Sequence, residues 1–136
     1  MTIRVDPTRA TPPSRQLVEA VLDRIACGTW SAGDRLPSVR GLAAEALVNP
    51  NTVGKAYREL EVLGVVAGRN GAGVFVTPEG PDTARTERRQ ATLAALHAAV
   101  EAALAAGHDA ARLHRAVAQR LGGAEGTEGA KRRRAS

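Results

Sequence analysis

The chain is poor in aromatic residues and in cysteine. Trp30, Tyr57 and Phe75 are its only aromatics, and all three precede residue 78, so we expect the compact core in the first part of the chain. Cys27 is the only cysteine, which excludes an intrachain disulfide and a cysteine-rich metal site. This usage fits the reducing cytoplasm, where we expect the protein to act on the nucleoid.

The chain also lacks a long apolar run. Its N-terminus has no apolar segment of the kind that a signal peptide needs. The stretch from Leu93 to Ala106 is too short to span a bilayer and is interrupted by His97 and Glu101. We therefore expect no membrane partner.

Net charge is small in the body of the protein. The formal charge is +5, but residues 1–77 hold nine Lys/Arg against seven Asp/Glu. Four positive charges lie in Lys131–Arg134, within a segment of low apolar content, 122–136, that we predict to be a disordered basic tail. We interpret this tail as a solvated segment, and nonspecific attraction to DNA is the alternative. Nucleic-acid binding is therefore inferred from the positions of individual charges and not from the net charge.

Groupings typical of enzymes are missing as well. No set of serine, cysteine and histidine supports hydrolysis, and no phosphate-binding loop precedes a predicted helix. His97 and His108 lie on different predicted elements, without a carboxylate or thiol at ligand spacing. With His114 they are interpreted as solvated or interface residues. We predict no enzyme activity, no metal site and no cofactor.

Hydrophobic spacing predicts three helices in the first part. After a flexible or extended lead-in, 1–12, residues 14–26 carry an apolar helical stripe that ends at Gly28. A turn-rich connector follows, in which Trp30 is predicted to cover the core and Asp34 to fix the turn. Ser38 is a good N-cap for a helix at about 39–47.

The third predicted helix, 49–63, is the one around which the chain is organised. Asn49 can cap it and Pro50 fits its first position. Its apolar residues recur at i, i+3, i+4 and i+7, so its polar first turn and later cations face away from the core. The tight link to the preceding helix predicts a helix-turn-helix.

Two short apolar runs follow, around the turn signal Asn70-Gly71, and predict a β-hairpin. The fold class predicted is therefore mainly α with a small β-hairpin: a winged helix-turn-helix over 1–77. We then expect a linker at 78–84 and a two-helix element at 85–121. That element is too small to hold a core of its own, so its apolar stripe must dock on the first domain or on another chain. The stripe consists of Leu93, Leu96, Val100, Leu104, Leu113, Val117 and Leu121.

Three blocks resemble the GntR family of bacterial transcription regulators. They are GDRLPSVRGLA, VNPNTVGKAYRELEVLG and RNGAGVFV, in order and at family spacing within residues 33–76. The short two-helix part resembles the YtrA-like subfamily. The resemblance implies a homodimeric repressor that binds a near-palindromic DNA operator, with the C-terminal helices as the dimerisation element.

The resemblance also implies DNA contacts. Arg40 matches an arginine that contacts the operator, and Gly71 matches a wing glycine placed in the minor groove. The full set implied is Arg35, Ser38, Arg40, Asn49, Asn51, Thr52, Lys55, Tyr57, Arg58 and Gly71. Two departures stand out: Gly41 replaces a capping-box glutamate, and Gly54 replaces a longer side chain in the third helix.

Physical chemistry supports part of this set. Asn51 can hydrogen-bond an adenine edge twice, and Thr52 can meet a thymine methyl or a phosphate. Arg58 has an alternative role in pairing with Glu59 or Glu61. Tyr57 lies on the buried stripe, which leaves only its hydroxyl for a phosphate.

The function predicted is sequence-specific DNA binding in transcription regulation. The alternative is a winged-helix protein-interaction module without sequence-specific DNA binding, for which apolar residues would be expected on the third helix's first turn. A small-molecule effector would need a pocket at the dimer interface or between domains, and the sequence does not show one.

Overall fold

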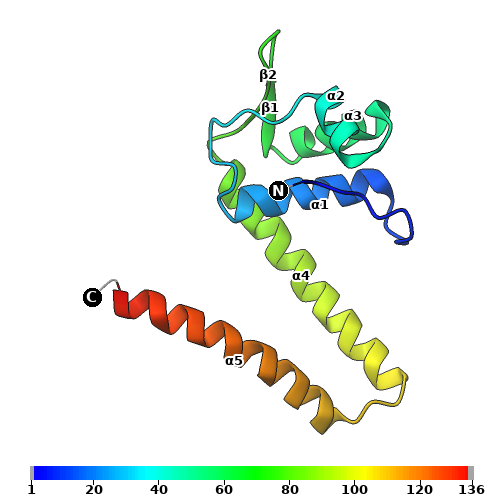
Figure 1. Ribbon diagram of the computed structural model, residues 1–136, viewed down its shortest axis with the longest axis vertical. Coiled ribbons are helices and arrows are strands. Elements are labelled where there is room, and N and C mark those ends of the chain that lie inside the picture. Colours follow the sequence, from blue (N-terminus) through cyan, green and yellow to red (C-terminus); the bar gives the residue numbers. More distant parts are fainter. Residues whose placement is uncertain (1, 135–136) are drawn as a thin grey trace. The chain divides into compact units, whose positions relative to one another are not determined.

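The computed structural model describes the backbone of residues 2–134 and the side chains of residues 2–122. The chain forms two compact units, Met1–Ala91 and Thr92–Ser136. It is mostly helical with one antiparallel hairpin, as predicted (Figure 1). Its elements are α1 Pro13–Ala26, α2 Val39–Ala46, α3 Pro50–Val62, β1 Val66–Arg69, β2 Gly73–Val76, α4 Gly80–Ala105 and α5 Ala110–Arg134.

Helix starts follow the predicted caps. The Ser38 hydroxyl oxygen accepts a hydrogen bond from the Gly41 amide at 3.0 Å, and the Asn49 side-chain oxygen accepts one from the Asn51 amide at 2.8 Å. Each cap satisfies a backbone donor that has no partner within its own helix. Leu47 ends α2 in the left-handed region, with φ of 57°, at the start of the short turn that leads into α3.

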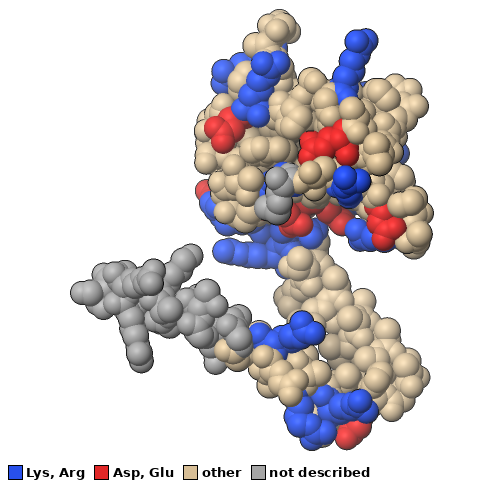
Figure 2. Space-filling model, viewed as in Figure 1, with Lys and Arg blue, Asp and Glu red and all other residues tan. Residues whose placement is uncertain are grey.

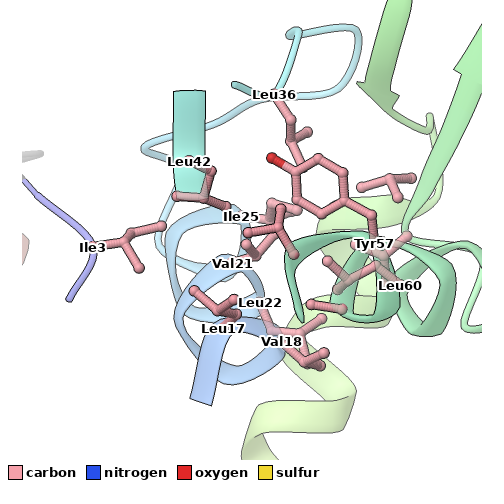
Figure 3. Packing of buried hydrophobic residues seen from close by; sticks show 14 of the residues in the cluster. Ile3, Leu17, Val18, Val21, Leu22, Ile25, Leu36, Leu42, Tyr57 and Leu60 are labelled. Carbon is pink, nitrogen blue, oxygen red and sulfur yellow. The ribbon is translucent and has the colours of Figure 1, made fainter. Parts of the chain in front are cut away.

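The core of the first unit is formed by α1 and α3 together with shorter apolar segments. The stripe predicted for α1 is buried, and α3 contributes Val53, Ala56, Tyr57 and Leu60. Figure 3 shows Tyr57 and Leu60 beside the apolar side chains of α1. Leu36, before α2, completes the cluster around Tyr57. Burying each large aliphatic side chain is worth about 1.5–3 kcal/mol, so this cluster fixes the orientation of α3. The side chain of Trp30 packs on the core, as predicted.

The hairpin gains a third strand-like partner that the sequence did not reveal. Within the hairpin, Val66 pairs with Val76 and Arg69 with Gly73. On the other edge of β2, the Leu36 amide donates to the Val74 carbonyl at 2.8 Å, and the Val76 amide donates to the carbonyl of Asp34 at 2.9 Å. The connector before α2 therefore anchors the hairpin to the helices.

The N-terminal lead-in is fixed more firmly than its sequence indicated. Ile3 is buried in the core, and its amide donates to Glu45 on α2 at 3.0 Å. The Asp6 amide donates to the Gln16 side chain at 2.9 Å, and that side chain donates back to the Asp6 carbonyl. The segment thus packs along α1 and α2.

Helix α4 begins inside the segment predicted as a linker. Gly80 and Ala84 are buried in the first unit, and Arg88 forms a 2.6 Å ion pair with Asp23 on α1. The first turns of α4 thus belong to the first unit, and the division between the units falls after Ala91 rather than at residues 78–84.

The second unit consists of the later part of α4 and of α5. Gly107, with φ of 92°, lies in the loop that joins them. The helix α5 extends past its predicted end near Leu121. The tail predicted at 122–136 falls almost wholly outside the residues whose side chains are described. Among the described residues, no helix has both the length and the apolar content that a membrane crossing requires.

Candidate nucleic-acid interface

A row of polar side chains runs along the exposed side of α3. Asn51, Lys55 and Arg58 are exposed, and they recur at i, i+4 and i+7, which places them one above the other on a helix. The opposite side is held in the core by Tyr57 and Leu60. Burial of one stripe therefore forces the other toward solvent, where a groove of DNA could receive it.

In the first turn of α3, one polar side chain caps the helix and another is exposed to solvent. The side-chain oxygen of Asn49 caps the helix, so its amide group is the part left to contact a ligand. Asn51 makes no side-chain hydrogen bond to another described residue, and both ends of its amide remain available. Thr52 is half-buried beside it. Asn51 is thus the exposed amide of this turn that is free to form two hydrogen bonds with a ligand.

Tyr57 and Ser38 face structural partners. The Tyr57 hydroxyl donates to the Pro37 carbonyl at 2.7 Å, and its residue is only 4% exposed. Burial, with a smaller effect from the Glu45 carboxylate, raises the pKa of Tyr57. The hydroxyl proton of Tyr57 is therefore engaged in a hydrogen bond inside the protein. Ser38 keeps the serine half of a capping box, although Gly41 removes the glutamate half.

Arg58 does not form the ion pairs that were the alternative to DNA contact. Glu59 instead lies 3.7 Å from Arg15 on α1, and Glu61 accepts a hydrogen bond from the Gly68 amide at 2.9 Å. Within the described part of the chain, Arg58 has no ion-pair partner. Its guanidinium lies along the helix, 3.4 Å from where a Cβ on residue 54 would stand.

The hairpin tip is bare. Gly71 adopts a φ of 72°, and a Cβ built there would meet no atom within 4 Å. Behind the tip, the Arg69 guanidinium lies 4.5 Å from the centre of the Phe75 ring. Arg35 lies beside Gly73, where a Cβ would come within 2.7 Å of its Nε. Two cations, Arg69 on β1 and Arg35 on the connector before α2, therefore lie behind a tip without bulk.

Arg69 is a candidate that the sequence analysis missed. Its position as the last residue of β1, one residue before the turn, is the signal that could have identified it. Arg40, from the predicted set, is exposed in the first turn of α2. Figure 2 shows Lys and Arg side chains projecting from the first unit, with acidic side chains between them.

The predicted dimerisation stripe is exposed in the second unit. Leu93, Leu96 and Leu104 on α4 and Leu121 on α5 are between 47% and 57% exposed, and large exposed apolar patches typically mark interaction surfaces. A groove of about 500 Å³ runs between α4 and α5, with its apolar lining interrupted by His97, Glu101 and His114. In the described part of the chain, no three His, Cys, Asp or Glu residues are grouped to hold a metal.

Comparison with known proteins links this geometry to a family. Residues 13–76 match the profile of the bacterial regulatory proteins of the gntR family. Over 81 residues, 60% of the chain, it is 38% identical to the HTH-type transcriptional repressor YtrA of Bacillus subtilis. It is 40% identical over 82 residues to the HTH-type transcriptional regulator Rv1152 of Mycobacterium tuberculosis. These segments span 62% and 68% of the two relatives.

The likeness to solved structures extends over most of the chain. The crystal structure of a transcriptional regulator from Oenococcus oeni superposes with a TM-score of 0.65 and 32% sequence identity. The superposition covers 86% of this chain and 97% of that one. The likeness therefore reaches beyond the matched 13–76 segment into the C-terminal helices.

Proposed function

The chain belongs to the GntR family of bacterial regulatory proteins, and from this premise we propose that it is a sequence-specific DNA-binding repressor that acts as a homodimer. The observation that carries the proposal is the row Asn51, Lys55 and Arg58 on α3, exposed and without ion pairs among the described residues. Such a row offers one base reader followed by two cations, which is what a helix in the major groove requires.

The recognition helix would enter the major groove by its first turn. Asn51 would bind an adenine edge, with Thr52 beside it at a thymine methyl or a phosphate. Lys55 and Arg58, farther along the helix, would neutralise phosphates of the backbone. Sequence preference then rests mainly on Asn51, and affinity mainly on the cations.

The wing would approach the adjacent minor groove. Gly71 has no side chain to collide with the groove walls, and Arg35 and Arg69 stand behind it to meet phosphates. Arg40 would contact the backbone from α2. Each cation that neutralises a phosphate adds close to one unit to the salt dependence of binding.

A second copy would double the short set of base contacts. The exposed stripe of α4 and α5 is the surface we propose for pairing, which would place two recognition helices about one DNA turn apart on a near-palindrome. Repression is proposed because the relative YtrA is named a repressor. We propose that the protein acts in the cytoplasm, where the chromosomal DNA is.

Selection from a pool of random duplexes tests the proposal. We expect an enriched inverted repeat with half-sites about 10 base pairs apart. On the selected duplex, Asn51→Ala should relax preference at one position per half-site, whereas Lys55→Ala should weaken all duplexes alike.

Two results would contradict the proposal. Binding that ignores sequence across the pool would favour the protein-interaction alternative. An equal loss on every duplex from both substitutions would refute the division between base reading and phosphate contact.

A further inference from the structure

Two glutamates border the basic row of α3. Lys55 and Glu59 are four residues apart, and Arg58 and Glu61 are three apart, so each pair could form an ion pair on the helix surface. Such pairs would cover the cations with carboxylates. In the structure, neither pair forms among the described residues.

On one side of the row, α1 supplies the competing partner for Glu59. Arg15 Nη1 lies 3.7 Å from Glu59 Oε2, and the Arg15 Nε lies 3.9 Å from Glu19. Arg15, Lys55, Arg58 and Glu59 line a common groove of about 360 Å³. Glu59 thus has Arg15 and Lys55 as neighbours in one groove and faces Arg15.

On the other side, the wing supplies the partner for Glu61. The Gly68 amide donates to Glu61 Oε1 at 2.9 Å. A Cβ at position 68 would stand 3.1 Å from that oxygen and would displace the carboxylate by a few tenths of an ångström. Both carboxylates are therefore drawn to neighbouring elements and away from the row.

From this arrangement we infer that Arg15 is a positioning residue for DNA binding. By holding Glu59 on the α1 side, it leaves the Lys55 ammonium free for a phosphate. The inference rests on the proposed function, because it concerns how the same helix meets DNA. Without Arg15, Glu59 turns to Lys55, and a phosphate must then displace a carboxylate before it binds.

A double-mutant cycle tests the inference. Wild type, Arg15→Ala, Glu59→Gln and the double variant are titrated against the selected inverted-repeat duplex by fluorescence anisotropy at several KCl concentrations. For each protomer bound, Arg15→Ala should raise Kd about twofold to fivefold, which is the range of a surface ion pair. It should also lower the slope of log Kd against log salt concentration by close to one for each protomer. Glu59→Gln should improve binding more in the Arg15→Ala background than in wild type.

Two further variants serve as controls. Arg15→Lys keeps the charge and should bind like wild type. Arg9→Ala removes the same charge from another ion pair of Glu19, at 3.8 Å, which includes no residue of α3, and should leave Kd within twofold of wild type. Thermal unfolding of each variant checks that the fold is intact.

The outcomes separate the inference from the proposed function. If wild type selects no duplex, the proposed function fails. If wild type binds and Glu59→Gln has the same effect in both backgrounds, Arg15 contacts DNA directly or acts by charge alone, and the positioning role is overturned. The same conclusion follows if Arg9→Ala and Arg15→Ala weaken binding equally.

Discussion

Tyr57 is the only tyrosine in the chain, and its hydroxyl joins α3 to the segment before α2. It donates to the Pro37 carbonyl at 2.7 Å from within the core. A buried donor without its acceptor costs about 1–3 kcal/mol, so this bond favours one orientation of α3 against α2. The residue thus fixes the helix that carries Asn51, the residue proposed to read a base.

Alkaline pH should expose this role. The pKa of Tyr57 is raised in the fold by burial, while an unfolded tyrosine ionises near pH 10. Below about pH 10 both states keep the proton and its contribution is complete. Above it the unfolded state binds fewer protons, so the free energy of unfolding falls with rising pH, by up to about 1.4 kcal/mol per pH unit.

The substitution Tyr57→Phe isolates the effect. At neutral pH it should lower the free energy of unfolding by about 1 kcal/mol through loss of the hydrogen bond. Between pH 9.5 and 11 it should lose stability less steeply than wild type in urea titrations. Absorbance at 295 nm gives a direct check, since tyrosinate appearing near pH 10 in the folded protein would contradict the buried state.

Leu47 is an exposed leucine in a backbone conformation that suits glycine. Its φ is 57° and its side chain is 78% exposed. The left-handed region costs a residue with a Cβ about 1–2 kcal/mol, partly offset in Leu47→Gly by the freer unfolded chain. We expect Leu47→Gly to raise the free energy of unfolding by about 0.5 kcal/mol.

A substitution to glycine at an ordinary helical position is the control for Leu47→Gly. Ala44 is exposed on α2, and Ala44→Gly should lower stability by about 1 kcal/mol. Urea denaturation of both variants would measure the two changes in the free energy of unfolding. Equal losses from the two substitutions would show that the turn does not strain Leu47.

At the scale of elements, the helices of the first unit could be predicted because short-range signals agree. Ser38 and Asn49 cap the helices that they were expected to cap, and the apolar stripe of α1 is the one buried. Long-range pairings could not be predicted. The bonds of the 33–36 segment with β2 and of Ile3 with Glu45 depend on residues dozens of positions apart, which no local period encodes.

Part of the candidate site could likewise be predicted from the sequence, and part could not. Helical periodicity was enough to place Asn51, Lys55 and Arg58 on one exposed face. It could not show that Arg15 and the Gly68 amide hold the two glutamates of α3, because those partners lie on other elements. The roles of the individual DNA contacts stay predictions.

Two helical glycines should respond to alanine in opposite directions. A Cβ on Gly80 would stand 2.5 Å from the Val65 carbonyl oxygen, a backbone atom that cannot easily move. Gly80→Ala should therefore lower the free energy of unfolding by about 1–3 kcal/mol. Gly54 meets only the tip of Arg58, at 3.4 Å, so Gly54→Ala should raise it by up to about 1 kcal/mol.

Thermal and urea unfolding of these variants measure both effects. A neutral Gly80→Ala would mean that the start of α4 does not lie against the Val65 carbonyl as described. DNA titration of Gly54→Ala adds a second result, because its Cβ borders the Arg58 guanidinium. Gained stability together with weaker binding would show that Gly54 is kept for the interface and not for the helix.

At the scale of the whole molecule, the two units differ in how they bury apolar surface. The first unit holds a core that includes the chain's only tyrosine. The second leaves Leu96 at 47% and Leu104 at 49% exposed, although both line the groove between α4 and α5. A second copy would cover these side chains, and it would also supply the second recognition helix that a near-palindrome needs.

Leu96→Asp tests this dependence in the full-length chain. An unpaired carboxylate buried in an apolar interface costs several kcal/mol, so we expect the variant to sediment as a monomer where wild type sediments as a dimer. Its affinity for the selected inverted repeat should fall at least tenfold, since about 1.4 kcal/mol of lost coupling suffices for that. Unfolding of the first unit should be unchanged, because Leu96 lies outside it.

Ala98→Asp is the matched control for Leu96→Asp. It adds the same charge to α4 two residues further on, about 200° around the helix, at a position that is also exposed. This variant should sediment and bind as wild type does. If both variants dissociate the dimer, the effect is one of charge on α4 and not of the apolar stripe. If neither does, the stripe is not the pairing surface, and two recognition helices must be brought together by another part of the chain.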